Sequence, residues 1–237
     1  MRTSADRFAS EIFGLVGGLK TGNFLTRERM QLVAVVVMAF TVLTLGFLAA
    51  TATGSVDILG RPLGTDFSSF YAAGRLVLEG TPTAPYAPAT QYAQQQVLFG
   101  ADTPFYAWQY PPLFLIIVAP LALLPYPLAL FAWQGGTFAL YLWTLAGIIK
   151  AWMPSDRTVA AALDSSWWIL AFGFPAIFVN PAHGQNGFLS AAVLGAALLM
   201  LDCRPVVAGI LFGLLAYKPQ LGVMIPLVLL TTSRWRT

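Results

Sequence analysis

Charged side chains are scarce in this chain: of its 237 residues, 10% are Asp, Glu, Lys or Arg, whereas 57% are hydrophobic. Soluble domains are nearer a quarter charged, so an ordinary globular protein is excluded, as are disordered and collagen-like chains. Four stretches have no charged residue at all: 30–56, 103–149, 165–201 and 219–233. Because a helix of about 20 apolar residues crosses a bilayer, the sequence predicts an all-α, polytopic integral membrane bundle.

Cysteine and histidine are almost absent, with one residue of each. Cys203 has no second cysteine for an intramolecular disulfide bond, and one Cys with one His argues against an all-protein zinc site. The formal net charge of +3 is too small to indicate a nucleic-acid partner. The basic residues are better explained by topology, because Lys and Arg gather at the cytoplasmic ends of membrane helices.

The amino-terminal segment 1–29 is predicted to be cytoplasmic because it is basic. The apolar run 30–52 follows it, and Ala50-Thr51-Ala52 at its end resembles a signal-peptidase site. This run is longer than the roughly 7–15 apolar residues of a signal peptide, and a long segment precedes it. We therefore interpret it as a retained anchor helix, and residues 30–237 as one transmembrane domain.

Residues 53–111 are predicted to form a long loop outside the membrane. The loop has four acidic and two basic residues, which gives it a net charge of −2: Asp57, Asp66, Glu79 and Asp102 against Arg61 and Arg75. After Asp66, apolar residues recur at helical spacing as far as Leu78, with Ser68 and Ser69 on the opposite face. This pattern predicts an amphipathic helix in the membrane interface, capped by Asp66 and ended by Gly80. A short polar helix is expected at 90–98.

The rest of the chain is predicted to contain further spans. Pro125-Tyr126-Pro127 separates a short helix at 113–124 from a full span at 128–149, and other spans are expected at 159–179, 187–201, 205–217 and 219–232. With the anchor helix, the count is seven. Arg234 and Arg236 favour a cytoplasmic carboxy-terminal tail, which needs an even number of crossings. Treating 113–124 as a half-span is the alternative that satisfies them.

Four short blocks occur in order along the chain. They are Gly64-Thr65-Asp66-Phe67 with Tyr71-Ala72-Ala73-Gly74, then Tyr110-Pro111-Pro112, Gly184-Gln185-Asn186, and Ala216-Tyr217-Lys218-Pro219-Gln220. In this order and spacing they resemble glycosyltransferase family 87, which comprises bacterial polyprenyl-phosphate-mannose-dependent mannosyltransferases with the GT-C membrane fold. The resemblance runs from about residue 32 to the end of the chain. Members of that family are usually longer, so a chain truncated at the carboxy-terminal end is one alternative.

The resemblance implies the transfer of a mannose-like sugar from a polyprenyl phosphate to a glycolipid or glycan of the cell envelope, with inversion. It also implies a multi-pass protein of the bacterial inner membrane. No cofactor follows with certainty, and a divalent cation is left open. The acceptor hydroxyl needs a base to take its proton, and Asp66 is the candidate catalytic residue because GT-C enzymes keep a carboxylate early in the first outer loop. The alternative for Asp66 is a plain helix cap.

Further polar residues are candidates for substrate binding, each with a structural alternative. His183, Gln185 and Asn186 either contact substrate or cap the next helix at the Gly184 break. Lys218 binds lipid phosphate or snorkels to the interface. The remaining candidates are Tyr71, Arg75 and Gln220. Trp108, Tyr110, Trp167 and Trp168 are interpreted as an aromatic belt among lipid headgroups rather than a sugar platform.

The sequence therefore predicts a membrane glycosyltransferase whose partners are the bilayer, a lipid-phosphate sugar and an acceptor glycan. A transporter or flippase for a lipid-linked sugar is the main rival. Transporters place broken helices and ionisable groups at the midplane of paired repeats, whereas the polar residues here lie in the first outer loop and at helix ends. An inactive remnant is the third alternative.

Overall fold

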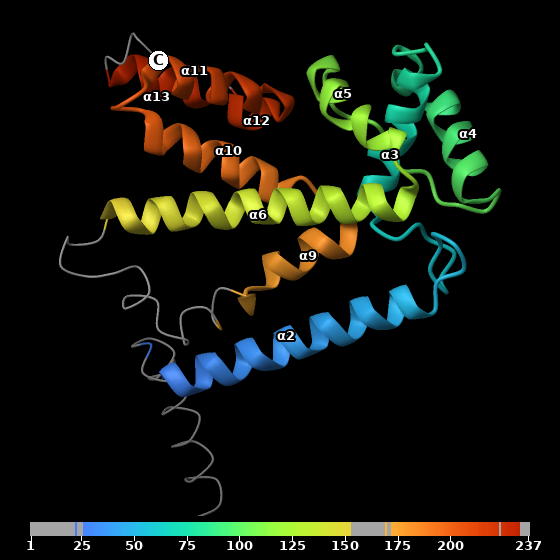
Figure 1. Ribbon diagram of the computed structural model, residues 1–237, viewed down its shortest axis with the longest axis horizontal. Helices are drawn as coiled ribbons and strands as arrows, with labels where there is room; N and C mark the ends of the chain where they lie inside the picture. The colour runs from blue at the N-terminus through green and yellow to red at the C-terminus, as the bar shows by residue number, and fades with distance from the viewer. Residues whose placement is uncertain (1–21, 23–25, 153–168, 170–171, 223, 233–237) are drawn as a thin grey trace, which may run out of the picture.

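The computed structural model describes residues 22, 26–152, 169, 172–222 and 224–232, and the ordered elements within this part of the chain are helices (Figure 1). The two isolated β-bridges, at Thr53–Val56 and Val56–Pro62, only shape the loop after the first helix. The elements are α2 (Arg27–Ala50), α3 (Thr65–Leu78), η1 (Ala84–Tyr86), α4 (Pro88–Phe99), α5 (Pro112–Val118), η2 (Pro120–Leu123), α6 (Tyr126–Trp152), α9 (Pro175–His183), α10 (Gly187–Met200), α11 (Pro205–Leu214), η3 (Leu215–Tyr217), α12 (Pro219–Gly222) and α13 (Met224–Thr231).

Helix α6 is the axis of the molecule, about 40 Å long at 1.5 Å per residue. Helix α10 runs along one side of it and α11 packs on α10, while α9 and α2 lie on the opposite side (Figure 1). The α6–α10 contact is close because Gly195 presents no side chain: a Cβ there would lie 2.7 Å from Thr144 Cγ2. Helices α3, α4 and α5 gather at the amino-terminal end of α6 (Figure 1).

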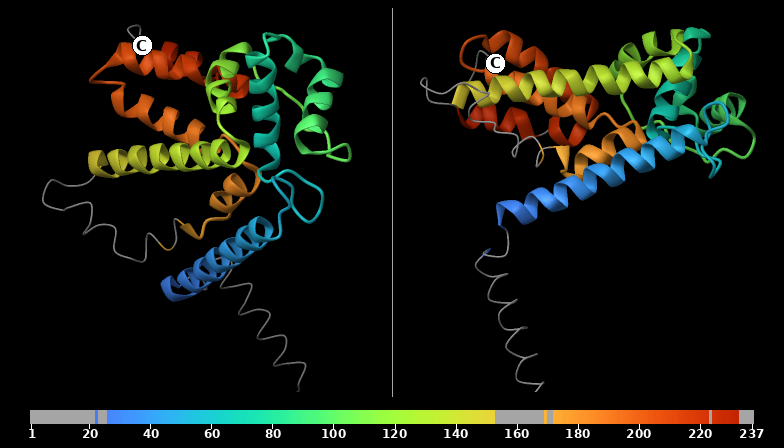
Figure 2. Two further views of the ribbon diagram at one scale, coloured as in Figure 1. Left: turned by 45° about the vertical axis from the view of Figure 1, so that its right-hand side comes forward. Right: turned by 60° about the horizontal axis from the view of Figure 1, so that its bottom comes forward.

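Helix α2 lies at the edge of the molecule in both views of Figure 2. Of its residues, Ala34 alone is buried, and Gly173 packs so closely on Ala34 that a Cβ on this glycine would overlap it. Among the described helices, α2 is the one both long and apolar enough to cross a membrane. The seven spans stay a prediction, and the expected span 159–179 falls largely outside the described residues.

Several sequence predictions of helix position are confirmed. A helix occupies 88–99 where a polar helix was expected, and the 113–124 segment is short, ending in the 3₁₀ turn η2 before α6 begins at Tyr126. Proline at the first helical turn of α4, α5, α9 and α11 explains these starts, because its fixed φ suits that position and its missing N–H has no intrahelical acceptor there.

Helix α3 is present, but the prediction that Asp66 caps it is wrong. The helix begins at Thr65, and its cap residue is Gly64, which adopts a left-handed conformation with φ 69° and ψ 65°. Glycine reaches this conformation without the steric cost of a Cβ. Asp66 is the second helical residue, so its carboxylate lies in the first turn, where the helix dipole favours a negative charge.

Helix α3 is buried on both faces. Its apolar face contributes Phe67 and Phe70, and its polar face is covered as well, since Ser68 and Ser69 are 0% and 2% exposed. Gly74 lets α5 and η2 approach, because a Cβ there would lie 2.7 Å from the Val118 carbonyl oxygen. The helix therefore forms the centre of the loop region rather than a surface layer. A position in the membrane interface stays a prediction.

An aromatic cluster fills the space between α3, α5 and α6. Phe114 packs edge-to-face on Phe70 and stacks on Tyr217, with ring centroids 5.3 and 4.9 Å apart. Trp108 joins this cluster against Phe70 and is only 8% exposed. The prediction that Trp108 faces lipid headgroups is therefore wrong. Trp167 and Trp168 lie outside the described residues.

Candidate functional site

The first and third sequence blocks meet at a contact between two glycines. Gly184 ends α9 in a left-handed conformation with φ 65°, and a Cβ on it would lie 2.5 Å from Phe67 Cβ and 3.4 Å from Gly64 Cα. The indole nitrogen of Trp133 on α6 donates to the Gly184 carbonyl oxygen at 3.0 Å and fixes the turn. The start of α3 is thus held against the turn between α9 and α10.

The second block adds Tyr110, whose ring packs on Phe70 of α3 with the centroids 5.3 Å apart and whose hydroxyl lies near Asn186, the residue before α10. Burial raises the pKa of Tyr110, the neighbouring Asn186 side chain acts in the opposite direction, and the Asp66 carboxylate raises the pKa further. Three blocks therefore contribute one polar side chain each to a common neighbourhood. A neutral Tyr110 hydroxyl at neutral pH can donate a hydrogen bond there.

Asn186 is 3% exposed, and its amide nitrogen has no hydrogen-bond acceptor among the described residues. A buried N–H₂ group without an acceptor costs about 1–3 kcal/mol. Such a group is expected to find an acceptor in a bound ligand or in water. Asn186 is thus a donor from which the neighbouring Tyr110 oxygen or a substrate oxygen can accept.

The fourth block joins this neighbourhood through Tyr217. The hydroxyl groups of Tyr217 and Ser190 lie 2.8 Å apart, which ties η3 to the first turn of α10. The Tyr217 and Tyr110 rings are 6.4 Å apart between centroids. All four blocks therefore converge at the amino-terminal end of α6, although they are far apart in the sequence.

The extended segment before α5 is held in place by buried glutamines of α4. Gln95 bonds the backbone of Tyr106 twice: its Nε2 donates to the Tyr106 carbonyl oxygen at 2.6 Å, and its Oε1 accepts from the Tyr106 N–H at 2.9 Å. Gln91 donates to the Ser69 carbonyl oxygen at 3.0 Å, and Ser69 Oγ donates to the Ala107 carbonyl oxygen at 3.1 Å. Helix α4 thereby fixes Tyr106 and Tyr110 beside α3.

The Asp66 carboxylate is a negative charge that acts on both of these tyrosines. Burial is the largest cause of the raised pKa of both Tyr106 and Tyr110, and Asp66 raises each pKa further. For Tyr106, the effects of Arg61 and Asp57 are both larger than that of Asp66. Within the described part of the chain, no group donates a hydrogen bond to Asp66 and no cation pairs with it. A carboxylate to which no described group donates a hydrogen bond is able to accept a proton from a substrate hydroxyl.

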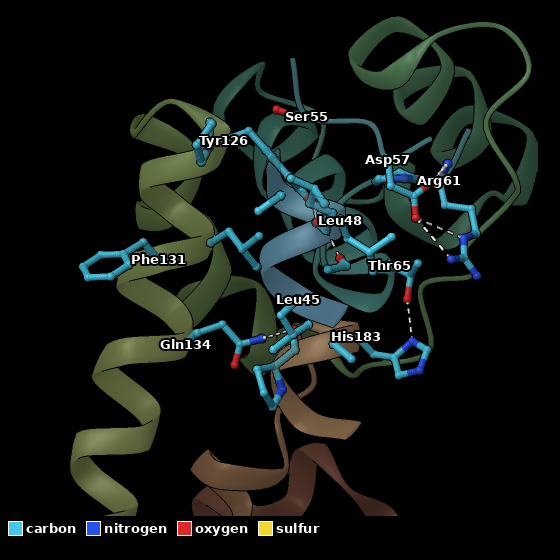
Figure 3. A pocket seen from close by; sticks show the side chains of 18 of the residues that line it. Leu45, Leu48, Ser55, Asp57, Arg61, Thr65, Tyr126, Phe131, Gln134 and His183 are labelled. Carbon is cyan, nitrogen blue, oxygen red and sulfur yellow. Dashed lines mark hydrogen bonds and ion pairs between the residues drawn. The ribbon is translucent and has the colours of Figure 1, made fainter. Parts of the chain in front are cut away.

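His183 lies on the other side of the Gly184 turn and faces a cavity of about 540 Å³. Its Nδ1 is 2.8 Å from the Thr65 hydroxyl (Figure 3). The turn therefore separates the polar residues that the sequence grouped together. The Asn186 side chain lies near Tyr110, on which Asp66 also acts, whereas the His183 ring contacts the Thr65 hydroxyl.

The other predicted substrate-binding residues have different surroundings. Lys218 is partly buried in the turn between η3 and α12; burial lowers its pKa, and no described carboxylate makes an ion pair with it. Gln220 is exposed and Gln185 is half-buried. The Tyr71 hydroxyl donates to the Leu124 carbonyl oxygen at 2.8 Å, and Arg75 pairs with Glu79 at 3.7 Å. The structure does not bring Tyr71 and Arg75 into the Asp66 neighbourhood, and a role for them in binding stays a prediction.

No group of three or more His, Cys, Asp and Glu side chains that could hold a metal ion occurs among the described residues. The polar side chains that the blocks bring near one another are amide and hydroxyl groups from several elements. These are the groups with which proteins orient sugars and polarise reacting oxygens through hydrogen bonds.

Comparison with known families assigns this helical protein to a class of enzymes. The model of glycosyltransferase family 87 matches residues 108–237, which is more than half of the chain. The chain therefore belongs to glycosyltransferase family 87, a family of membrane proteins. No curated protein and no solved structure gives a significant match. The matched region contains the second, third and fourth blocks; Asp66 precedes it.

Sequence reasoning missed four residues that build the site. Ser190 and Trp133 lie within apolar helices, and their partners, Tyr217 and the Gly184 carbonyl oxygen, are distant in sequence. Gln91 and Gln95 were assigned to a polar helix without a role. Their spacing of four residues places both on one face of α4, and this spacing was the available signal.

Proposed function

We propose that this glycosyltransferase moves a mannose-like sugar from a polyprenyl phosphate to a hydroxyl group of a glycolipid or glycan. Family membership supports the transfer of a sugar. The lipid-phosphate donor follows from the resemblance of the four blocks, and the convergence of those blocks in space supports treating them as one site. The proposed location is the bacterial inner membrane, in several passes, with the amino terminus in the cytoplasm.

The observation that carries the mechanism is the state of Asp66, a carboxylate without a hydrogen-bond donor among the described residues, whose charge acts on Tyr110. In the proposed step, the acceptor oxygen attacks the anomeric carbon while Asp66 takes its proton. The bond from that carbon to the phosphate oxygen breaks, and its electron pair leaves with the lipid phosphate. Attack opposite the leaving group inverts the anomeric centre.

The developing negative charge on the leaving phosphate needs donors or a cation. The unpartnered amide nitrogen of Asn186 and the Tyr110 hydroxyl are available as donors. Lys218 is proposed as the cation, with Gln220 two residues further along, because no described carboxylate neutralises it. Its partial burial keeps the ammonium less hydrated than in water and strengthens its attraction for phosphate.

The test is Asp66→Asn, assayed by transfer from a radiolabelled polyprenyl-phosphate mannose in membranes that contain an active parent chain. Removal of a general base costs about 10²–10⁴-fold in rate. Because Gly64 and not Asp66 caps α3, the substitution keeps the helix start intact. Asp102→Asn is the matched control, since this exposed carboxylate lies in the turn after α4.

Retention of more than about a third of the activity in Asp66→Asn would contradict the base assignment, because even the smallest loss expected for a general base is larger. Abundance and membrane insertion are measured in parallel and should match the parent chain. A parent chain without any transfer would instead favour the inactive remnant.

A further inference from the structure

The cavity that His183 faces lies between α2, the loop before α3, the first turns of α6, and α9 (Figure 3). Its volume of about 540 Å³ is within the usual size of small-molecule sites. Leu45 and Leu48 of α2 and Leu130 and Phe131 of α6 line it, and Phe178 of α9 completes an apolar wall. This part of the cavity suits a hydrocarbon chain.

The other end of the cavity is polar and lies against the start of α3. Here the Thr65 hydroxyl and His183 Nδ1 are 2.8 Å apart (Figure 3), and either ring nitrogen of His183 can donate or accept. Because His183 is exposed, a ligand can reach this pair. A hydroxyl and an imidazole that both donate and accept are suited to bind alcohol groups.

The charges at this end compensate each other. Asp57 accepts from Arg61 Nε at 3.3 Å and from Arg61 Nη2 at 3.2 Å, and its other oxygen accepts the backbone N–H groups of Leu59 and Arg61. The Asp57 side chain is only 5% exposed, so this pairing is built into the loop. A phosphate group would meet a carboxylate here and a guanidinium that is already paired.

These observations favour an amphiphile with an uncharged head. An alcohol loses little when it leaves water for a site with hydroxyl and imidazole partners, whereas an ionised group needs an uncompensated opposite charge. Lys218, which no described carboxylate neutralises, lies in the turn before α12, and the cavity lining does not include it.

We propose that this cavity holds the acceptor: an amphiphile with a hydrocarbon chain and an uncharged, hydroxyl-bearing head such as a sugar. This inference rests on the proposed function, because it assigns the acceptor to one side of α3. Thr65 lines the cavity and Asp66 follows it directly in α3, so the head of the acceptor lies at the start of the helix that carries the carboxylate, while the donor phosphate is assigned to the side of Lys218.

The experiment is photolabelling of the full chain in membranes with an alkyl glucoside that carries a diazirine in its chain. An alkyl phosphate with the same chain and diazirine is the charged probe. We expect the glucoside to label peptides from α2 and α6 that line the cavity. The alkyl phosphate should label these peptides at least about five-fold less, the equivalent of about one lost hydrogen bond.

Paired variants identify the site. Leu45→Trp fills the cavity and should abolish glucoside labelling, whereas Leu43→Trp, at an exposed position on the same helix, should not change it. Thr65→Val should lower labelling by about five-fold because it removes one hydroxyl partner, and Thr65→Ser should restore it. A monodisperse peak in size-exclusion chromatography shows that each variant is folded.

Equal labelling of Leu45→Trp and the parent chain would overturn the proposal, as would equal or stronger labelling by the alkyl phosphate. Labelling is also measured in Asp66→Asn, where it should persist. If Asp66→Asn keeps its transfer activity while glucoside labelling follows the expected pattern, the catalytic proposal fails and the cavity assignment stands. If labelling fails while Asp66→Asn is inactive, the cavity assignment fails and the catalytic proposal stands.

Discussion

At Gly184, the absence of a side chain decides how closely α3 approaches the turn between α9 and α10. The residue combines a left-handed φ of 65° with a position where a Cβ would lie 2.5 Å from Phe67 Cβ. Asn186 and His183 flank Gly184, and of these two residues only His183 lines the cavity. The separation between the Asp66 neighbourhood and the cavity therefore depends on one glycine.

Gly184→Ala is expected to destabilise the protein by about 2–5 kcal/mol, the sum of a left-handed alanine and an overpacked contact. Thermal unfolding followed by fluorescence-detected size-exclusion chromatography measures the change. Gly213→Ala is the control: Gly213 lies in α11, a Cβ there would meet no atom within 4 Å, and the variant should be neutral or stabilising. A Gly184→Ala melting temperature equal to that of the parent chain would disprove the close contact.

Single residues also show what the sequence can predict. The importance of Gly64, Asp66 and Asn186 was visible because they occur in family-like blocks. The sequence did not show the position of Asp66 within its helix. Asp is a favoured cap residue, whereas the structure has the left-handed Gly64 in that place, where it contacts Gly184. The preference of Asp for cap positions therefore predicted the wrong first residue for α3.

At the scale of elements, α4 holds the extended segment that carries Tyr106 and Tyr110 in place through hydrogen bonds. Its two buried glutamines replace the pairing that a neighbouring strand would supply to an extended backbone. Gln95 satisfies both the N–H and the carbonyl group of Tyr106. The position of the tyrosine hydroxyl groups relative to Asp66 thus depends on a helix that contributes no side chain to the reacting groups.

Gln95→Leu should lower transfer activity and stability together, because it leaves two partly buried backbone groups of Tyr106 without partners, at a cost of up to about 1–3 kcal/mol each. Gln94→Leu, one residue earlier and partly exposed, loses only a bond to Glu79 and should be nearly neutral. Transfer assays and thermal unfolding of both variants test this. Equal activity and stability of Gln95→Leu and Gln94→Leu would show that the Gln95 hydrogen bonds are dispensable.

Element positions were largely predictable, whereas their environment was not. Prolines and glycines locate the starts and ends of α4, α5, α6 and α10 within a few residues. Hydrophobic periodicity located α3 but did not reveal that Ser68 and Ser69 are buried, because a helix covered on both sides by protein can carry small polar residues on its second buried face. The same periodicity is shared by a helix at a membrane surface.

For the whole molecule, the charge distribution predicts which side of the membrane carries the site. The basic segment 1–29 should be cytoplasmic and the loop 53–111 outside. Cysteine introduced by Thr81→Cys in a Cys203→Ser background should react with a membrane-impermeant maleimide in intact cells, since Thr81 is exposed. Reaction only after lysis would reverse the orientation and place Asp66 in the cytoplasm.

The convergence of the four blocks could not be derived from the sequence, because each block is local and their contacts are not. Asp66, Tyr110, Asn186 and Tyr217 come together through helix packing around α6. The order of blocks indicated the family, and that family matches 108–237. The cavity was not predicted at all, since its lining is drawn from four separate segments.

The contact between Gly64 and Gly184 spans 120 residues (184 − 64), which has a consequence for biogenesis. At a translation rate of about 5–20 residues per second, the ribosome adds the second glycine about 6–24 s after the first. During this interval the nascent chain contains α3 without the turn that covers its first residues. The surroundings of the carboxylate are therefore complete only after the second half of the chain has been synthesised.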